Sequence, residues 1–236
     1  MMGLIKNEYI KLGLFKIVFP IILFSIVIIL EYYLNKVLMF EDIIKIIPYV
    51  GIVLCIIFSG IVSNEIESGT FRFYLTKSIS RVKILTSKLL AVYIYTFIIY
   101  SFILILFLII SGNIPFKLII KYYEYIIPIY TILSCTFFLS NFIKNTPINL
   151  GMCILLFSFG GFMSELLLNK GIKIIEYTLL PYFDFSIFLD KLSINAINLE
   201  YGINLNISYA IFINIVHIFV FIILSYFIFS KKDIKY

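Results

Sequence analysis

Residues 89–116, LLAVYIYTFIIYSFILILFLIISGNIPF, form a long apolar run that contains no charged side chain. A helix needs about 20 consecutive apolar residues to cross the hydrocarbon core of a bilayer. The whole chain has the same character, because 62% of its 236 residues are hydrophobic and only 14% are charged. A soluble domain carries about a quarter charged residues. The chain is therefore predicted to be an all-α integral membrane protein.

Charged residues divide the remainder of the chain into similar runs. The uncharged runs cover 17–30, 46–64, 89–116, 125–143, 145–164 and 201–230. The first run stops at Glu31, but the apolar pattern continues to Leu34, and an acid near a helix end reaches the interface. We therefore predict six transmembrane helices in a single domain over residues 1–236. The predicted spans cover approximately 17–34, 46–63, 89–111, 125–143, 147–167 and 208–229.

The first sixteen residues, MMGLIKNEYIKLGLFK, are predicted to form an amphipathic helix before the first span. No small-x-small cleavage site follows the apolar core, so we interpret the first span as a retained helix and not as a signal peptide. The side chains expected to face lipid are those of Leu4, Ile5, Ile10, Leu12 and Leu14. Those expected to face water are Lys6, Asn7, Glu8 and Lys11.

The basic residues predict the orientation of the chain. With a cytoplasmic N-terminus and six spans, the inner segments hold 12 basic and four acidic residues, a net charge of +8, and the outer segments carry −2. This is the positive-inside pattern, so both termini of a multi-pass cell-membrane protein are predicted to be cytoplasmic. Topology explains the basic composition, and nucleic acid is not an expected partner.

Few residues inside the predicted spans have catalytic or metal-binding chemistry. Cys55, Cys135 and Cys153 lack metal-ligand spacing and are expected to be reduced packing residues. His217 has no ionisable neighbour in the sequence that would make it part of a proton relay, so a packing role is expected. The longest segment between spans, 165–200, is strongly apolar and is predicted to form external re-entrant or interfacial helices.

Residues 64–88, NEIESGTFRFYLTKSISRVKILTSK, form a polar connection between the second and third predicted spans. Glu65 and Glu67 stand at the end of span two, and Gly69 is expected to break or redirect the helix. Ser78 or Ser80 is expected to cap the helix that follows. The side chains of Arg81, Lys83 and Lys88 are expected at the level of the lipid phosphates. Basic residues alone would orient the chain, so the paired acids call for another explanation.

This connection resembles the signature of ABC-2 type transporter permeases. In that family an acid-x-acid-x-Gly-Thr stretch, a small-residue turn, a basic residue and a lysine follow the second span. The matching residues are Glu65, Glu67, Gly69, Thr70, Ser80, Arg81 and Lys88. The family commonly has a proline in the turn, where this chain reads Lys77-Ser78-Ile79-Ser80. Length and composition further resemble the bacteriocin and lantibiotic immunity subunits of that family.

The resemblance implies a transport subunit that is not itself an enzyme and holds no cofactor. The chain contains no Walker-type Gly-x-x-x-x-Gly-Lys-Ser/Thr motif, so ATP and Mg²⁺ would bind to a separate ABC ATPase subunit. The polar connection, with Arg72 among its residues, would be the coupling helix that contacts this subunit. The expected assembly also includes membrane lipid and a second permease, either another copy or a related chain. Export of an amphipathic or lipid-like substrate is expected, and the narrower resemblance suggests an antimicrobial peptide.

Two other classes of function are weighed against this one. An intramembrane enzyme would need paired histidines, a His-Glu-x-x-His motif or acid pairs near the headgroups, whereas the chain has one histidine and only Glu41-Asp42 as adjacent acids. An ion-coupled secondary transporter without an ATPase partner would carry ionisable groups or broken helices near the midplane. Pro20, Pro48 and Pro128 lie in spans that have no central charge. The secondary transporter remains the alternative.

Overall fold

The computed structural model describes residues 2–36, 38–69, 79–112, 115–143, 145–173, 178, 195, 198–204 and 206–231. Helices dominate this part of the chain, and no strand occurs in it. The helices are α1 (Met2–Asn35), α2 (Phe40–Phe58), α3 (Ser63–Glu67), α5 (Arg81–Ser111), α6 (Phe116–Glu124), α7 (Ile126–Phe142), α8 (Thr146–Asn169) and α11 (Ile207–Lys231). The predicted all-α class is confirmed.

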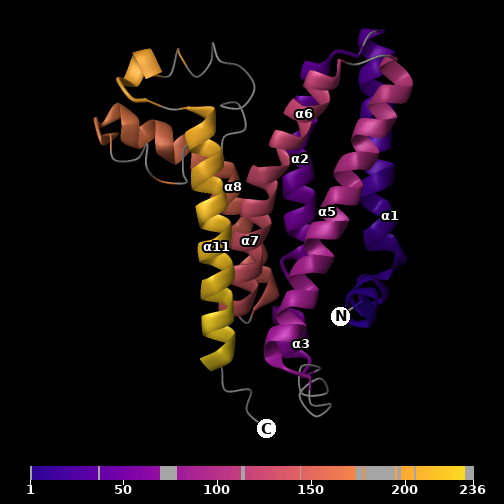
Figure 1. Ribbon diagram of the computed structural model, residues 1–236, viewed down its shortest axis with the longest axis vertical. Helices are drawn as coiled ribbons and strands as arrows, with labels where there is room; N and C mark the ends of the chain where they lie inside the picture. The colour runs from indigo at the N-terminus through magenta and orange to yellow at the C-terminus, as the bar shows by residue number, and fades with distance from the viewer. Residues whose placement is uncertain are drawn as a thin grey trace.

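The long helices stand side by side as a bundle, with α7 at its centre (Figure 1). Helix α7 packs against α2, α5, α8 and α11. Buried hydroxyl groups of α7 bond to carbonyls one turn earlier in the same helix, as Thr131 does to Ile127 and Ser134 to Tyr130. Small polar residues of this kind allow close helix contacts without leaving a polar group unsatisfied in an apolar surrounding.

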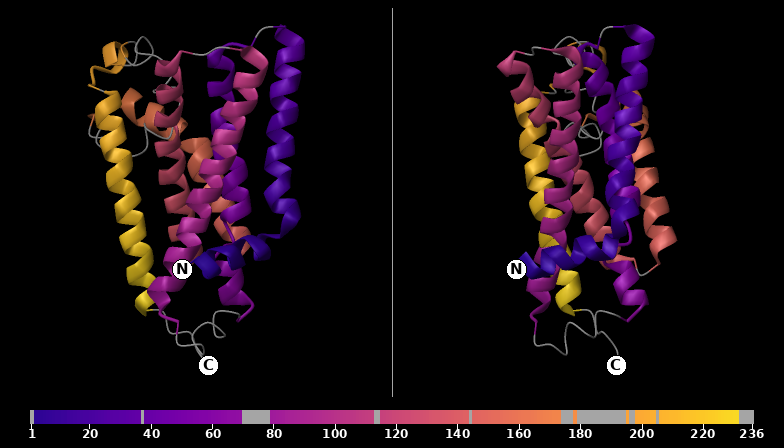
Figure 2. Two further views of the ribbon diagram at one scale, coloured as in Figure 1. Left: turned by 45° about the vertical axis from the view of Figure 1, so that its right-hand side comes forward. Right: turned by 90° about the vertical axis from the view of Figure 1, so that its right-hand side faces the viewer.

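Helix α1 consists of two pieces that meet at Gly13. This glycine has a φ of 77° and a ψ of 152°, a conformation that strains any residue with a Cβ. The piece before it runs across the bundle, and the piece after it runs along the bundle (Figure 2). Ile10 and Leu14 are exposed, as the predicted amphipathic helix requires. Glu8, which was expected to face water, is instead buried, with 5% of its surface exposed.

A proline in the second piece of α1 is compensated by a side chain of α5. Pro20 has no backbone N–H, so the carbonyl of Lys16, four residues earlier, lacks its helical donor. The hydroxyl of Tyr95 donates to this carbonyl at 3.1 Å and to that of Ile17 at 2.9 Å. The bond joins α1 to α5 at the point where the helix would otherwise be weakest.

Five helical stretches of the described chain are long and apolar enough to cross a membrane. They are Met2–Asn35, Asp42–Glu67, Arg81–Ser111, Phe116–Phe142 and Ile207–Lys231. The chain is therefore a multi-pass membrane protein. The predicted span at 147–167 coincides with α8. Within α8, Thr146–Leu155 is an apolar helix that is shorter than a membrane span. The half of α8 nearer to Asn169 runs across the bundle and not along it (Figure 1), so a sixth span is not confirmed.

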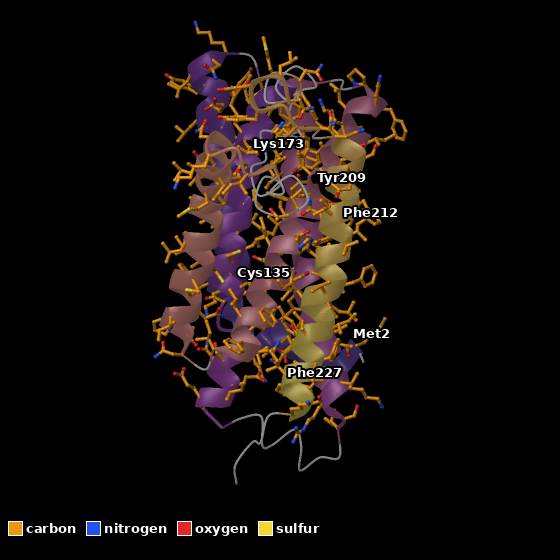
Figure 3. The ribbon with its side chains drawn as sticks, turned by 90° about the vertical axis from the view of Figure 1, so that its left-hand side faces the viewer. Met2, Cys135, Lys173, Tyr209, Phe212 and Phe227 are labelled. Carbon is orange, nitrogen blue, oxygen red and sulfur yellow. The ribbon has the colours of Figure 1, made fainter. Side chains whose placement is uncertain are left out.

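One end of the bundle gathers the elements that the sequence analysis placed in the cytoplasm. Met2 and Phe227 lie toward this end, Lys173 and Tyr209 lie toward the other, and Cys135 lies between them (Figure 3). Both ends of the α3–α5 connection lie at the same end as Met2 (Figure 2). The orientation of this end in the membrane remains a prediction.

The remaining predictions concern the spans and the segment before α11. All three cysteines are buried, and Cys55 lies 3.4 Å from the hydroxyl of Thr136. His217 forms a 2.8 Å hydrogen bond with the carbonyl of Ile213 in its own helix. Most of the predicted re-entrant segment 165–200 lies outside the described residues.

We predict that single cysteines at Glu67 and Lys117 react with membrane-impermeant maleimide from opposite sides of the membrane. Glu67 is the last residue of α3 and Lys117 is the second residue of α6, so the apolar helix α5 runs between them. With the positive-inside rule, Glu67→Cys should be labelled only after the cells are opened, and Lys117→Cys in intact cells. The three native cysteines are buried and provide the unlabelled control. Labelling of Glu67→Cys in intact cells would contradict the orientation.

Candidate functional site

Lys88 lies on α5 and is completely buried, with none of its surface exposed. Its ammonium nitrogen lies 2.7 Å from Glu8 Oε2 and 2.9 Å from Glu65 Oε1. It also donates to the backbone carbonyl of Ile61 at 3.1 Å. Three acceptors thus meet the three N–H groups of one ammonium, which is the arrangement that a buried lysine requires.

A second lysine completes the group of charges. Lys11 Nζ lies 2.5 Å from Glu65 Oε1 and 3.9 Å from Glu8 Oε1. Lys11 is partly exposed, whereas Glu8 and Glu65 are buried. We call Glu8, Lys11, Glu65 and Lys88 the ion network. It holds two positive and two negative charges, so it is neutral as a unit.

Three elements that are distant in the sequence supply the network. Glu8 and Lys11 come from the N-terminal piece of α1, Glu65 comes from α3, and Lys88 comes from the second turn of α5. Glu8 and Lys11 are three residues apart and therefore share a face of their helix. The hydroxyl of Tyr9 donates to the carbonyl of Ala91 at 3.0 Å, which fixes the N-terminal piece against α5. The N-terminal piece of α1 crosses beside the lower end of α5 in Figure 2.

The structure brings two of the predicted coupling residues together and leaves others apart. Glu65 and Lys88, which stand near the two ends of the polar connection, form a direct ion pair. Glu67 is exposed, and no contact of its side chain with the network is described. Gly69 has a φ of 70°, so the predicted turn of the chain after α3 is confirmed. Thr70 and Arg72, and the predicted coupling helix around them, lie outside the described residues.

The start of α5 agrees with the prediction at one residue and differs at another. Ser80 is the N-cap, and its hydroxyl accepts from the backbone N–H of Lys83 at 3.4 Å. Arg81 donates to the carbonyls of Phe229 and Ser230 in the last turn of α11, at 3.3 and 3.1 Å. Lys88 was expected at the lipid phosphates, and this is wrong. Two buried carboxylates hold it inside the protein instead.

Sequence reasoning missed Glu8 and Lys11 as members of the site. Both were interpreted as the water-facing side of an amphipathic helix, because polar residues of such a helix usually face the headgroups. A usable signal was present: opposite charges three residues apart on a short helix, in a chain with only 13 acidic residues. The matching charges, Glu65 and Lys88, lie more than fifty residues away, and only the fold joins them.

The chemistry of the site is that of a structural ion network. Within the described residues, no group of three or more His, Cys, Asp or Glu side chains is placed to hold a metal ion. Each carboxylate of the network faces an ammonium at short distance. The arrangement can transmit force among three helices, because pulling one charge away leaves its partners buried and uncompensated.

Comparison with known proteins identifies the family of the chain. Residues 30–235 match the family described as "Protein of unknown function (DUF2705)", and the chain belongs to this family. No curated protein matches the chain.

We predict that Lys88→Met strongly destabilises the protein. The methionine fills a similar volume, but Glu8 then loses its buried partner and Glu65 keeps only Lys11. Removing one partner of a buried ion pair costs about 3–5 kcal/mol. Thermal unfolding in detergent should therefore begin at a markedly lower temperature than in the parent protein.

Lys83→Met is the matched control, since Lys83 lies on the same helix and is exposed. Its unfolding temperature should stay near that of the parent. A second variant, Glu8→Gln with Lys88→Met, removes one charge of each sign and should recover part of the loss. Equal unfolding temperatures for Lys88→Met and Lys83→Met would show that the ion network contributes nothing measurable.

Proposed function

We propose that this member of the DUF2705 family is the membrane-spanning permease subunit of an ABC exporter, whose ATP is hydrolysed by a separate subunit. The observation that carries the proposal is the ion pair between Glu65 and Lys88. These two residues match the ABC-2 signature near opposite ends of the polar connection. Their side chains join the two ends of that connection, with Lys88 Nζ 2.9 Å from Glu65 Oε1.

A connection whose two ends are joined by an ion pair is suited to pass movement to several helices. The connection leaves α3 through Gly69, whose left-handed conformation sets its direction, and enters α5 at Ser80. From this ion pair, Glu65 reaches the N-terminal piece of α1 through Lys11. Arg81 reaches the end of α11 through two carbonyls. A push on the connection by an ATPase subunit would therefore act on α1, α5 and α11 together.

The partners of the proposed permease follow from the same assignment. An ABC ATPase subunit would contact the α3–α5 connection from the cytoplasm. A second permease, either an identical or a related chain, would complete the pathway. Long apolar faces on α1 and α11 suit contact with lipid or with another apolar helix, because few of their side chains are buried within the chain. An amphipathic or lipid-like substrate, such as an antimicrobial peptide, fits this surrounding.

An ion-coupled secondary transporter is less well supported by the described residues. Such a transporter needs ionisable groups that alternate between the two sides near the bilayer midplane. The ion network instead lies beside α3, at one end of the bundle (Figure 1). Its charges are already matched with one another. Transport by the purified chain without any ATPase would favour this alternative.

We predict that Glu67→Lys leaves the fold intact and weakens coupling to the ATPase. Glu67 is exposed at the start of the connection, so its reversal disturbs no described buried contact. A charge-assisted hydrogen bond to a partner contributes about 1.5–3 kcal/mol, so its loss should lower affinity by roughly tenfold or more. The measurement is co-purification with an ABC ATPase expressed together with this chain, followed by ATP turnover in the presence and absence of the permease.

Glu31→Lys is the control for a charge reversal near the opposite end of the bundle, because Glu31 lies in the last turns of α1. It should retain both the ATPase and its stimulation. Glu65→Lys is a poor test of coupling, since the new ammonium would lie beside Lys11 and Lys88 and would disrupt folding. If Glu67→Lys binds and stimulates the ATPase normally, Glu67 does not take part in the coupling site. Failure of the parent chain to bind any ATPase would contradict the permease assignment itself.

A further inference from the structure

The second membrane helix is interrupted just before the ion network. Helix α2 ends at Phe58, four residues form turns, and the chain becomes helical again as α3 from Ser63 to Glu67. There is no proline at the interruption, which covers Ser59–Val62. A helix break without proline needs side chains or water that take over the backbone groups it releases.

Side chains of neighbouring helices take over three of the backbone groups released at this break. In a continuous helix, the N–H of Ser63 would donate to the carbonyl of Ser59, and that of Val62 to Phe58. Both N–H groups instead donate to the hydroxyl oxygen of Ser140 on α7, each at 3.1 Å. The carbonyl of Ser59 accepts from the side-chain amide of Asn149 on α8. The carbonyl of Phe58 accepts from the N–H of Ile61, as in a tighter turn.

The lysine of the ion network takes the next carbonyl. In a continuous helix, the carbonyl of Ile61 would accept from the N–H of Glu65. That N–H donates to Val62 instead, at 3.2 Å, and Lys88 Nζ donates to Ile61 at 3.1 Å. Lys88 therefore holds the break through a backbone carbonyl and holds α3 through the carboxylate of Glu65.

The first turn of α8 also holds α3 on the far side of the break. The hydroxyl groups of Ser63 and Thr146 lie 2.9 Å apart and share a hydrogen bond. Thr146 also donates to the side-chain oxygen of Asn64 at 2.6 Å. A Cβ added to Gly60 would lie only 2.9 Å from both Asn64 Cγ and Thr146 Cγ2. Real Cβ atoms essentially never show such close contacts, so any larger residue at this position would force the side chains of Asn64 and Thr146 to shift.

We infer that Ser59–Val62 is a hinge, and that Ser140, Thr146 and Asn149 are positioning residues that hold it in its bent state. The second state is a continuous helix from α2 through α3, in which the N–H of Ser63 returns to the carbonyl of Ser59. In the continuous helix, backbone N–H groups would take over the carbonyls of Ser59 and Ile61, which Asn149 and Lys88 hold in the bent state. A partner that binds one state better than the other would shift their populations.

The hinge determines how α3 moves relative to the membrane helices. Because Glu65 lies beyond the break and the ion network binds it, the N-terminal piece of α1 would follow α3 when the hinge straightens. The step from this movement to transport rests on the proposed function. The existence of the hinge does not, since it is a property of the chain alone.

Removing the side chains that hold the bent state should straighten the hinge. Ser140→Ala with Asn149→Ala withdraws the acceptor of two N–H groups and the donor to Ser59. The measurement is the distance between spin labels at Glu67 and Ile148, both exposed, by double electron–electron resonance in lipid nanodiscs. Glu67 lies five residues beyond Val62, a lever of about 7 Å, so a changed hinge angle moves its label by several ångströms. The expected result is a longer distance than in the parent.

Ser225→Ala is the matched control for loss of a buried hydroxyl, because this hydroxyl bonds to the carbonyl of Phe221 in its own helix, at 2.7 Å. Its distance distribution should equal that of the parent. The single variant Ser140→Thr keeps the acceptor oxygen and leaves Asn149 in place, so it should keep the bent state and the parent distance.

Gly60→Ala tests the hinge without removing any hydrogen-bonding group. The new methyl group would displace the side chains of Asn64 and Thr146, whose hydrogen bonds hold α3 in the bent state, so the variant should also lengthen the distance between the labels. Gly51→Ala is its control, since a Cβ at Gly51, in α2, meets nothing within 4 Å. Adding Asn64→Ala and Thr146→Ser to Gly60→Ala removes the obstructing atoms and should return the parent distance.

The outcomes separate the hinge from the transport assignment. Longer distances in both the Gly60→Ala and the Ser140/Asn149 variants, with unchanged distances in the controls, would support the hinge. Unchanged distances in both variants would overturn it and leave a fixed kink. These measurements need no ATPase, so a moving hinge together with a chain that binds no ATPase would overturn only the proposed function.

Discussion

The buried ammonium of Lys88 is the constraint on which the end of this bundle depends. An ammonium removed from water is strongly destabilising unless anions and hydrogen-bond acceptors surround it. Glu8, Glu65 and the carbonyl of Ile61 provide this surrounding. To bring them there, the N-terminal piece of α1 has to fold back at Gly13 and α2 has to open before α3. A single side chain thus requires two departures from straight helices.

The same rule acts wherever a backbone group loses its helical partner. Water is scarce among apolar helices, so each released N–H or carbonyl needs a partner from the protein. Tyr95 donates to the carbonyl that Pro20 leaves without a donor, and Ser140 accepts the two N–H groups released after α2. These polar residues stand in segments that are otherwise apolar. Their positions follow the irregularities of neighbouring helices and not a pattern along their own helix.

This dependence explains what the sequence could and could not predict. Uncharged runs predicted the long helices, because length and apolarity are local properties. Gly69 and Ser80 were also predictable, since a turn glycine and an N-cap serine act on their own backbone. The burial of Lys88 was not predictable, because a lysine near a helix end is ordinarily found at the headgroups. The break at Ser59–Val62 has no proline to announce it, and Ser140 and Asn149, which hold it, lie on other helices.

The ion network and the neutral hydrogen bonds around the break differ in strength, so the parts that they join are expected to move differently. Separating the ion network would leave buried charges without partners, so Glu8, Lys11, Glu65 and Lys88 tend to stay together. The contacts of Ser140, Thr146 and Asn149 are mostly neutral hydrogen bonds, each of which contributes only about 0.5–1.5 kcal/mol. Movement is therefore expected at the neutral contacts, between α3 and the α7–α8 pair. The N-terminal piece of α1, α3 and the start of α5 would then move as one body, carrying the two ends of the polar connection with them.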